Sequence, residues 1–209
     1  GEFMSKTKRG IFICIEGIDA SGKTTQARRL VKNLKARGFD AIYTTEPSRG
    51  KVGAFVRRYV LDRKKRLPIA VEALLFAADR VDHVETRIKP WLDNRNIVVC
   101  DRYVYSTLAY QGAAGLSPNW IEQVNRFALV PDLALFLDVP PEVVVKRLNR
   151  RRSVMETRRN QRKVREMYMK MVEDKRLILV DGNKPISKVA EGVLTVVLDF
   201  LKRCQGFSG

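Results

Sequence analysis

The stretch GIDASGKT, residues 17–24, decides the fold, because it matches the pattern GxxxxGK[ST] at every constrained position. Its two glycines let the backbone curl so that its N–H groups point inward at an anion. The helix expected to follow would add its positive end. We therefore predict a loop that holds the phosphates of ATP, with Lys23 at the β and γ phosphates and the Thr24 hydroxyl on Mg²⁺. The residues predicted to bind ATP are Gly17, Ile18, Asp19, Ala20, Ser21, Gly22, Lys23, Thr24 and Thr25.

Short apolar runs alternate with amphipathic stretches on both sides of this loop. Residues 11–16 (IFICIE) predict a buried strand before it, and residues 24–37 predict a helix that ends at Gly38. Nearly continuous apolar strands separated by helices are typical of parallel sheets covered on both faces. We expect an α/β fold in three layers, a five-stranded parallel sheet flanked by helices on both faces. The other expected strands are 40–44, 96–100, 132–138 and 177–180, and the other helices 52–61, 69–88, 119–128, 140–150 and 186–202.

The length of 209 residues favours one domain, which we assign to residues 4–209. Residues 1–3 (GEF) precede Met4 and resemble the remnant of an expression tag. No apolar run reaches the roughly 18 residues of a membrane span. Three cysteines without a CxxC pair argue against a disulfide framework, so we expect a cytoplasmic protein.

A few single residues predict structure rather than chemistry. Cys14 and Cys100 fall on two apolar runs, and we expect both to be small buried hydrophobes on neighbouring strands. His83 is the only histidine, which excludes a multi-histidine metal site. We expect His83 on a helix surface or at a subunit contact.

Positive charge is concentrated in one segment. The formal net charge is +17, and residues 146–166 hold ten basic and two acidic residues. Such a segment can bind DNA, RNA or a small polyphosphate. Nothing in the sequence resembles an RRM, a KH domain or a zinc finger. We expect a basic lid over residues 147–165 that closes over a polyphosphate.

Three further groups of residues are suited to bind the second substrate. Asp101 and Arg102 directly follow an expected strand, where an aspartate can hold magnesium and an arginine a phosphate. Glu46 follows another strand in the same way and precedes Pro47. Phe76 and Arg80 lie four residues apart on an expected helix and share a face, where a base could stack beside a guanidinium.

Taken together, these motifs resemble the thymidylate kinase family of P-loop kinases, which make dTDP from dTMP and ATP. The string DRYVYSTLAYQG is the most specific of them. The resemblance extends from about residue 11 to residue 201 and follows the family's order. The matching segments are EGIDASGKTTQ (16–26), TEP (45–47), LLFAADR (74–80), DRYVYSTLAYQG (101–112), PDLALFLDVPPE (131–142) and VREMY (164–168).

The resemblance implies roles for individual residues. Phe76 would stack on thymine, Arg102 would bind the dTMP phosphate, and Tyr110 would lie against the deoxyribose. Asp101 would join Thr24 in the magnesium site, and a non-trans peptide bond is expected before Pro47. A homodimer that uses the Phe76 helix is implied as well. The residues implied to bind dTMP are Asp19, Glu46, Pro47, Phe76, Arg80, Arg102, Ser106, Thr107, Tyr110 and Gln111.

The resemblance also indicates where the remaining catalytic charge lies. No basic residue occupies the variable positions of the loop, so the catalytic arginine is expected in the lid. The family's usual Asp-Arg-x-Glu is replaced by SVME at residues 153–156, which indicates an archaeal branch. The candidates for that arginine are Arg150, Arg151, Arg152 and Arg158, and we expect Arg152, then Arg151, to act beside Lys23 and Arg102.

Two other functions stay open at this point. A related kinase could act on dUMP, on another monophosphate or on a nucleoside. A nucleic-acid-stimulated ATPase could use the basic surface, and it would bind DNA or RNA in a salt-sensitive way. A panel of acceptors distinguishes these functions.

Overall fold

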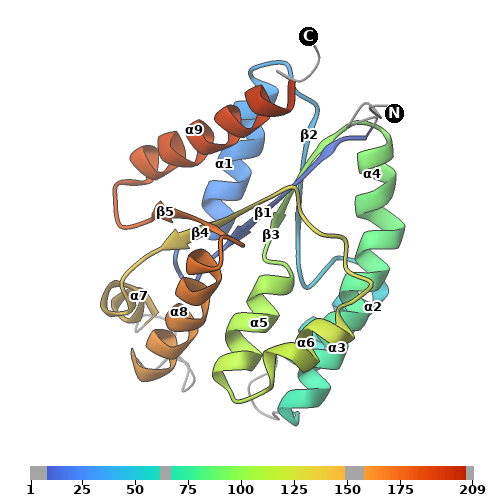
Figure 1. The fold of residues 1–209 in the computed structure, drawn as a ribbon, viewed down its shortest axis with the longest axis vertical. Coiled ribbons are helices and arrows are strands. Elements are labelled where there is room, and N and C mark those ends of the chain that lie inside the picture. Colours follow the sequence, from blue (N-terminus) through green and yellow to red (C-terminus); the bar gives the residue numbers. More distant parts are fainter. Residues whose placement is uncertain (1–8, 62–66, 149–157, 206–209) are drawn as a thin grey trace.

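The computed structural model describes residues 9–61, 67–148 and 158–205, and in these it has a five-stranded sheet with helices on both faces (Figure 1). Every strand pair is parallel, and the strand order is β2-β3-β1-β4-β5. This confirms the predicted α/β fold. The strands are β1 (Ile11–Glu16), β2 (Ala41–Thr45), β3 (Ile97–Asp101), β4 (Leu133–Asp138) and β5 (Ile178–Asp181).

Strand composition follows position in the sheet. The central strands β1 and β3 are almost wholly buried, which is why their sequences are continuously apolar. Cys14 lies opposite Cys100 in the β1–β3 register, and both are buried and free, as predicted. The edge strand β5 is short, and Ile178 and Leu179 in it remain 40% exposed.

Each face of the sheet carries its own apolar core. Leu30, Leu34 and Val193, from α1 and α9, pack with Ile13 on one face. On the other face Phe136 stacks on Tyr168 of α8, with ring centroids 4.7 Å apart. The helices are α1 (Lys23–Lys35), α2 (Lys51–Tyr59), α3 (Ile69–His83), α4 (Lys89–Asp93), α5 (Val104–Ala113), α6 (Pro118–Val124), α7 (Pro141–Leu148), α8 (Arg158–Glu173) and α9 (Ile186–Gln205).

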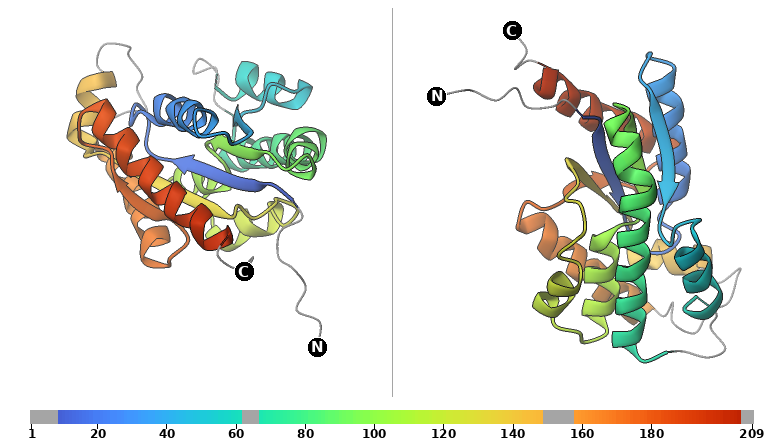
Figure 2. Two further views of the ribbon diagram at one scale, coloured as in Figure 1. Left: turned by 90° about the horizontal axis from the view of Figure 1, so that it is seen from above. Right: turned by 90° about the vertical axis from the view of Figure 1, so that its right-hand side faces the viewer.

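One expected helix is longer than its sequence pattern indicated. The helix predicted over residues 69–88 continues through a π-helical turn, η1 (Val84–Ile88), into α4. Figure 2 shows the three as one column along the molecule. None of the helices in the described ranges has the length and apolarity that crossing a membrane requires.

Two helices were not predicted, for opposite reasons. Helix α5 (VYSTLAYQGA) is nearly apolar all round because α3, α6 and α8 pack against it, so it has no amphipathic period. Helix α8 carries so many charges that its narrow apolar stripe is hard to detect. Val164, Tyr168 and Met171 form that stripe at helical spacing and lie in the core.

Candidate functional site

The loop after β1 curls as its glycines predicted, with backbone in the left-handed region. Gly22 has φ of 93°, and Ala20 has φ of 55°. A Cβ on Gly17 would lie 2.5 Å from Ser21 Oγ and 3.1 Å from the Leu137 carbonyl oxygen, so a side chain there would displace the Ser21 hydroxyl. The loop leads directly into α1, whose first N–H groups therefore face the same space.

Lys23 turns back over this loop. Its Nζ donates to the Ile18 carbonyl oxygen at 2.7 Å, and the side chain is buried. Burial, followed by the positive charge of Arg102, lowers the pKa of Lys23 to about 7. An anion bound in the loop would oppose both effects and raise the pKa of Lys23, because a negative charge favours the ammonium form.

Thr24 and Asp101 bring two hard oxygen donors together. Thr24 Oγ1 donates to Asp101 Oδ2 at 2.5 Å, and the Tyr43 hydroxyl donates to the same oxygen at 3.2 Å. Asp101 ends β3 next to β1, so the strand register sets this contact. Hydroxyl and carboxylate oxygens at the mouth of a phosphate loop are the donors that Mg²⁺ prefers.

Arg102 joins the loop to the segment that follows β3. Its guanidinium donates to Asp19 Oδ1 at 2.5 Å, to Ser106 Oγ at 3.1 Å and to the Gly17 carbonyl oxygen at 3.3 Å. The guanidinium also lies 5.1 Å from the centre of the Tyr110 ring. Burial by itself would raise the pKa of Asp19, but the charges of Arg102 and Lys23 outweigh burial and lower it.

A buried carboxylate that the sequence did not single out supports Arg102. Glu16 is 0% exposed, and its Oε2 accepts from Ser106 Oγ at 2.6 Å and from the Tyr168 hydroxyl at 2.9 Å. Its Oε1 accepts from the Tyr103 backbone N–H at 2.7 Å. Burial raises the pKa of Glu16. This residue therefore connects β1, α5 and α8 around the arginine.

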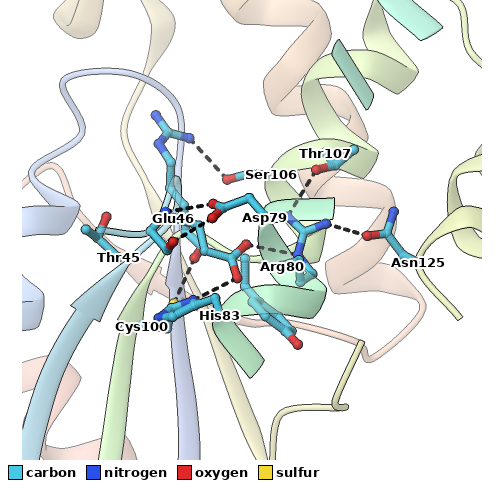
Figure 3. Close-up of polar contacts among 12 residues, drawn as sticks. Thr45, Glu46, Asp79, Arg80, His83, Cys100, Ser106, Thr107 and Asn125 are labelled. Atoms are coloured by element: carbon cyan, nitrogen blue, oxygen red, sulfur yellow. Dashed lines mark hydrogen bonds and ion pairs between the residues drawn. The ribbon is translucent and has the colours of Figure 1, made fainter. Parts of the chain in front are cut away.

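Arg80 lies in a second, fully buried polar group (Figure 3). Its Nε donates to Glu46 Oε2 at 2.9 Å and its Nη2 to Thr107 Oγ1 at 3.2 Å. Its Nη1 donates to Asn125 Oδ1. We did not predict Asn125, because a lone asparagine at the end of α6 has no local signal that it meets Arg80.

The segment after β2 is held by buried contacts as well. Its Glu46–Pro47 peptide bond is cis, which confirms the non-trans bond that we expected. Asp79 of α3 accepts from Ser48 through both the backbone N–H, at 2.7 Å, and Oγ, at 2.5 Å. Arg57 of α2 donates to the Pro47 carbonyl oxygen at 2.6 Å. Glu46 is thus presented from an anchored turn.

The structure corrects the expectation for His83. This residue is 2% exposed, so it does not lie on a helix surface. Its ring contacts Thr44 and Glu46, because this side of α3 faces the end of β2.

Two other residues predicted to bind dTMP lie on α3 and α5. Phe76, one helical turn before Arg80, is half-buried, and Gln111 is buried in α5.

The lid predictions fall largely outside the described residues. Arg150, Arg151 and Arg152 lie in the range 149–157, and the side chain of Arg158 is likewise outside the description. Two basic residues outside that range contact the phosphate loop and the end of β4. Arg147 Nη1 donates to the Ala20 carbonyl oxygen at 3.0 Å. Arg165 Nε and Nη2 donate to the two carboxylate oxygens of Asp138, each at 2.7 Å.

A parallel sheet with a phosphate-binding loop after β1 and an Asp-Arg pair after the neighbouring β3 defines a P-loop phosphotransferase. The profile of the thymidylate kinase family matches residues 15–193. The chain belongs to the thymidylate kinase family, whose activity is the phosphorylation of dTMP with ATP.

Archaeal relatives extend this assignment over most of the chain. A probable thymidylate kinase of Pyrococcus abyssi is 42% identical over 197 residues, which cover 90% of this chain and 96% of the relative. A probable thymidylate kinase of Methanocaldococcus jannaschii is 40% identical over 192 residues, covering 92% and 96%. The archaeal sources agree with the branch that SVME indicated.

The low pKa of Lys23 makes a testable prediction about nucleotide binding. In the free protein the amine is largely neutral at about pH 8, and a bound triphosphate favours the ammonium, so ATP binding takes up close to one proton. Affinity should fall as pH rises above 7, by up to about tenfold per pH unit. Calorimetry at about pH 8, in two buffers of different ionisation enthalpy, measures the proton uptake.

Lys23→Arg serves as the matched control for this measurement. Arginine stays charged at these pH values, so the proton uptake should disappear in the variant if ATP still binds. Equal uptake in both proteins would assign the proton to another group and contradict the prediction.

Proposed function

We propose that the site described above transfers the γ-phosphoryl group of ATP to dTMP and gives dTDP and ADP for dTTP synthesis. The observation that carries this proposal is the contact of Arg102 with Asp19 across the phosphate loop. It brings an arginine from the segment after β3 within reach of anything bound at Lys23. An acceptor phosphate on Arg102 would therefore lie beside the donor phosphates. Such positioning, together with charge neutralisation, carries phosphoryl transfer.

The donor side uses the loop residues 17–25. Their backbone N–H groups and Lys23 would hold the β and γ phosphates, and the buried amine would gain its proton there. Thr24 and Asp101 would hold Mg²⁺, supported by the Tyr43 hydroxyl. When bound there, Mg²⁺ would supply positive charge that offsets the negative charge of the phosphates during transfer.

The acceptor side uses the two arginine groups. Arg102 would bind the dTMP phosphate, and its guanidinium is aimed by Ser106, Asp19 and the ring of Tyr110. Arg80 would contact the base, on which Phe76 stacks, while Glu46 and Thr107 hold the guanidinium. The residues proposed to line this pocket also include Pro47 and Gln111. The attacking phosphate oxygen is already ionised, so a chain without a free histidine needs no general base.

The lid arginines complete the proposed mechanism. Arg152, then Arg151, are predicted to neutralise the transferring phosphoryl group and to help exclude water. Arg147 supports this, because it already reaches the loop backbone at Ala20. The reaction is predicted to occur in the cytoplasm.

The proposed function is tested by ADP production from Mg-ATP with one acceptor at a time. The acceptors are dTMP, dUMP, dCMP, dGMP, AMP, thymidine and single-stranded DNA. We expect a large rate with dTMP and small rates with AMP, thymidine and DNA. A comparable rate with dUMP would mean that the pocket barely senses the thymine methyl group. DNA-stimulated hydrolysis without any dTMP-dependent ADP would contradict the proposal.

Loss of either central cation should reduce turnover strongly. Arg102→Ala removes the proposed phosphate ligand and Lys23→Ala the donor cation, and each should lower kcat/KM at least about 100-fold. Steady-state kinetics with dTMP and Mg-ATP measure the loss. Arg203→Ala is the matched control, because Arg203 lies near the end of α9 and donates to the Asp199 carbonyl oxygen of the same helix. A loss of tenfold or less in either variant would remove that residue from the mechanism.

We also propose that the protein is a homodimer through α2 and α3. Phe55 and Tyr59 on α2 pack against each other with tilted rings and remain exposed, and Leu61 after α2 is exposed too. Val71 and Leu74 on α3 are 40% and 48% exposed. Since α2 packs on α3, these exposed apolar side chains belong to neighbouring helices, which supports self-association through this pair of helices.

The dimer proposal predicts the effect of a single charge. Leu74→Glu should halve the mass measured by analytical ultracentrifugation, because an unpaired carboxylate would be buried at the interface. Phe127→Glu, on a similarly exposed apolar side chain beyond α6, should leave the mass unchanged. A monomeric wild-type protein, or a Leu74→Glu variant that stays dimeric, would rule out this interface.

A further inference from the structure

His83 uses both of its ring nitrogens inside the protein. Nε2 lies 2.8 Å from Thr44 Oγ1, and Nδ1 lies 3.1 Å from Glu46 Oε1. The imidazole is 2% exposed, so no solvent competes for either nitrogen. Figure 3 shows the ring against Glu46, on the side away from Asn125 and Thr107. The histidine thus connects the end of β2 to the carboxylate that follows it.

The same carboxylate continues the chain to Arg80. Oε1 of Glu46 is hydrogen-bonded to His83, and Oε2 accepts from Arg80 Nε at 2.9 Å. That leaves the terminal nitrogens of Arg80 to donate to Thr107 on α5 and Asn125 at the end of α6. One buried line of hydrogen bonds that begins at His83 therefore connects α3 to the end of β2, to α5 and to the end of α6.

The Glu46 carboxylate accepts, so Nδ1–H is the donor of that contact. The second hydrogen bond joins Nε2 and the Thr44 hydroxyl, and either of them can be its donor. Without His83, Glu46 Oε1 would be buried without this partner, a costly state. The Glu46 carboxylate could then turn so that both of its oxygens accept from Arg80. This bidentate contact would draw the guanidinium away from Thr107 and Asn125.

A metal site is the competing interpretation of this cluster. One donor atom each from Glu46, His83 and Cys100 lies within 4.8 Å of the others, and all three residues are buried. Both Glu46 oxygens and both His83 nitrogens already have partners, and Cys100 Sγ donates to the Arg102 carbonyl oxygen at 3.0 Å. The Arg80 cation beside Glu46 would also repel a metal ion. The contacts favour a hydrogen-bonded cluster.

We propose that His83 is a positioning residue for the acceptor nucleotide. It touches neither substrate. It holds Glu46 in the single orientation that presents Arg80 to the base. This inference rests on the proposed assignment of Arg80 to the acceptor pocket, and it goes further, because it assigns a function to the buried imidazole.

The test separates positioning from stability by comparing the KM values of the two substrates. His83→Leu should raise the KM for dTMP about tenfold or more while the KM for ATP changes less than about twofold. His83→Asn should recover most of the loss, because its amide N–H can stand where Nδ1–H stood. His83→Gln should not recover it, because its amide lies nearer to Nε2. Ile88→Ala, in the buried turn that follows, should lower the melting temperature and leave both KM values unchanged.

Several outcomes would overturn the proposal. One is an equal rise of both KM values in His83→Leu, and another is a His83→Asn variant no better than the leucine variant. Stoichiometric zinc in the wild-type protein that is lost in His83→Leu, measured by elemental analysis, would establish the metal interpretation instead.

Arg80→Met separates a failure of the acceptor assignment from a failure of the role proposed for His83. If it leaves the dTMP KM unchanged, the acceptor assignment fails together with this proposal. If it raises that KM and His83→Leu does not, only the role of His83 fails.

Discussion

The pairing of β1 with β3 is the constraint on which the site depends. The strands are parallel and in register, with Ile15 opposite Asp101, so the phosphate loop and the Asp-Arg segment leave the sheet side by side. The contacts from Thr24 to Asp101 and from Arg102 to Asp19 follow directly from that register. Adding β2 beside β3 brings Glu46 to the same edge. Strand pairing alone therefore brings together residues that are far apart in the sequence.

Charge compensation determines how these groups can be buried. Arg80 and Glu46 are almost fully enclosed, and breaking such a pair by removing one partner typically costs about 3–5 kcal/mol. Arg102 instead faces Asp19 at the more open loop, where both side chains keep some exposure. The first pair is therefore suited to hold a fixed shape, and the second to exchange its partner for a phosphate group.

Local signals in the sequence predict the sheet and the loop but not the partners of the buried polar groups. The phosphate loop and the central strands could be predicted because each depends on residues adjacent in the chain. Helix α5 was missed because burial on several sides removes its periodicity. Glu16, Asn125 and the environment of His83 could not be predicted, because their roles arise from contacts across 37 to 152 residues. The expectation of an exposed His83 failed for this reason.

The short edge strand β5 also affects how copies of the protein meet in solution. Its four residues offer few free backbone groups to a neighbouring chain, although Ile178 and Leu179 are partly open to water. Charged residues flank it at Lys175, Arg176 and Lys184. Brevity and charge together protect this edge from strand-to-strand aggregation.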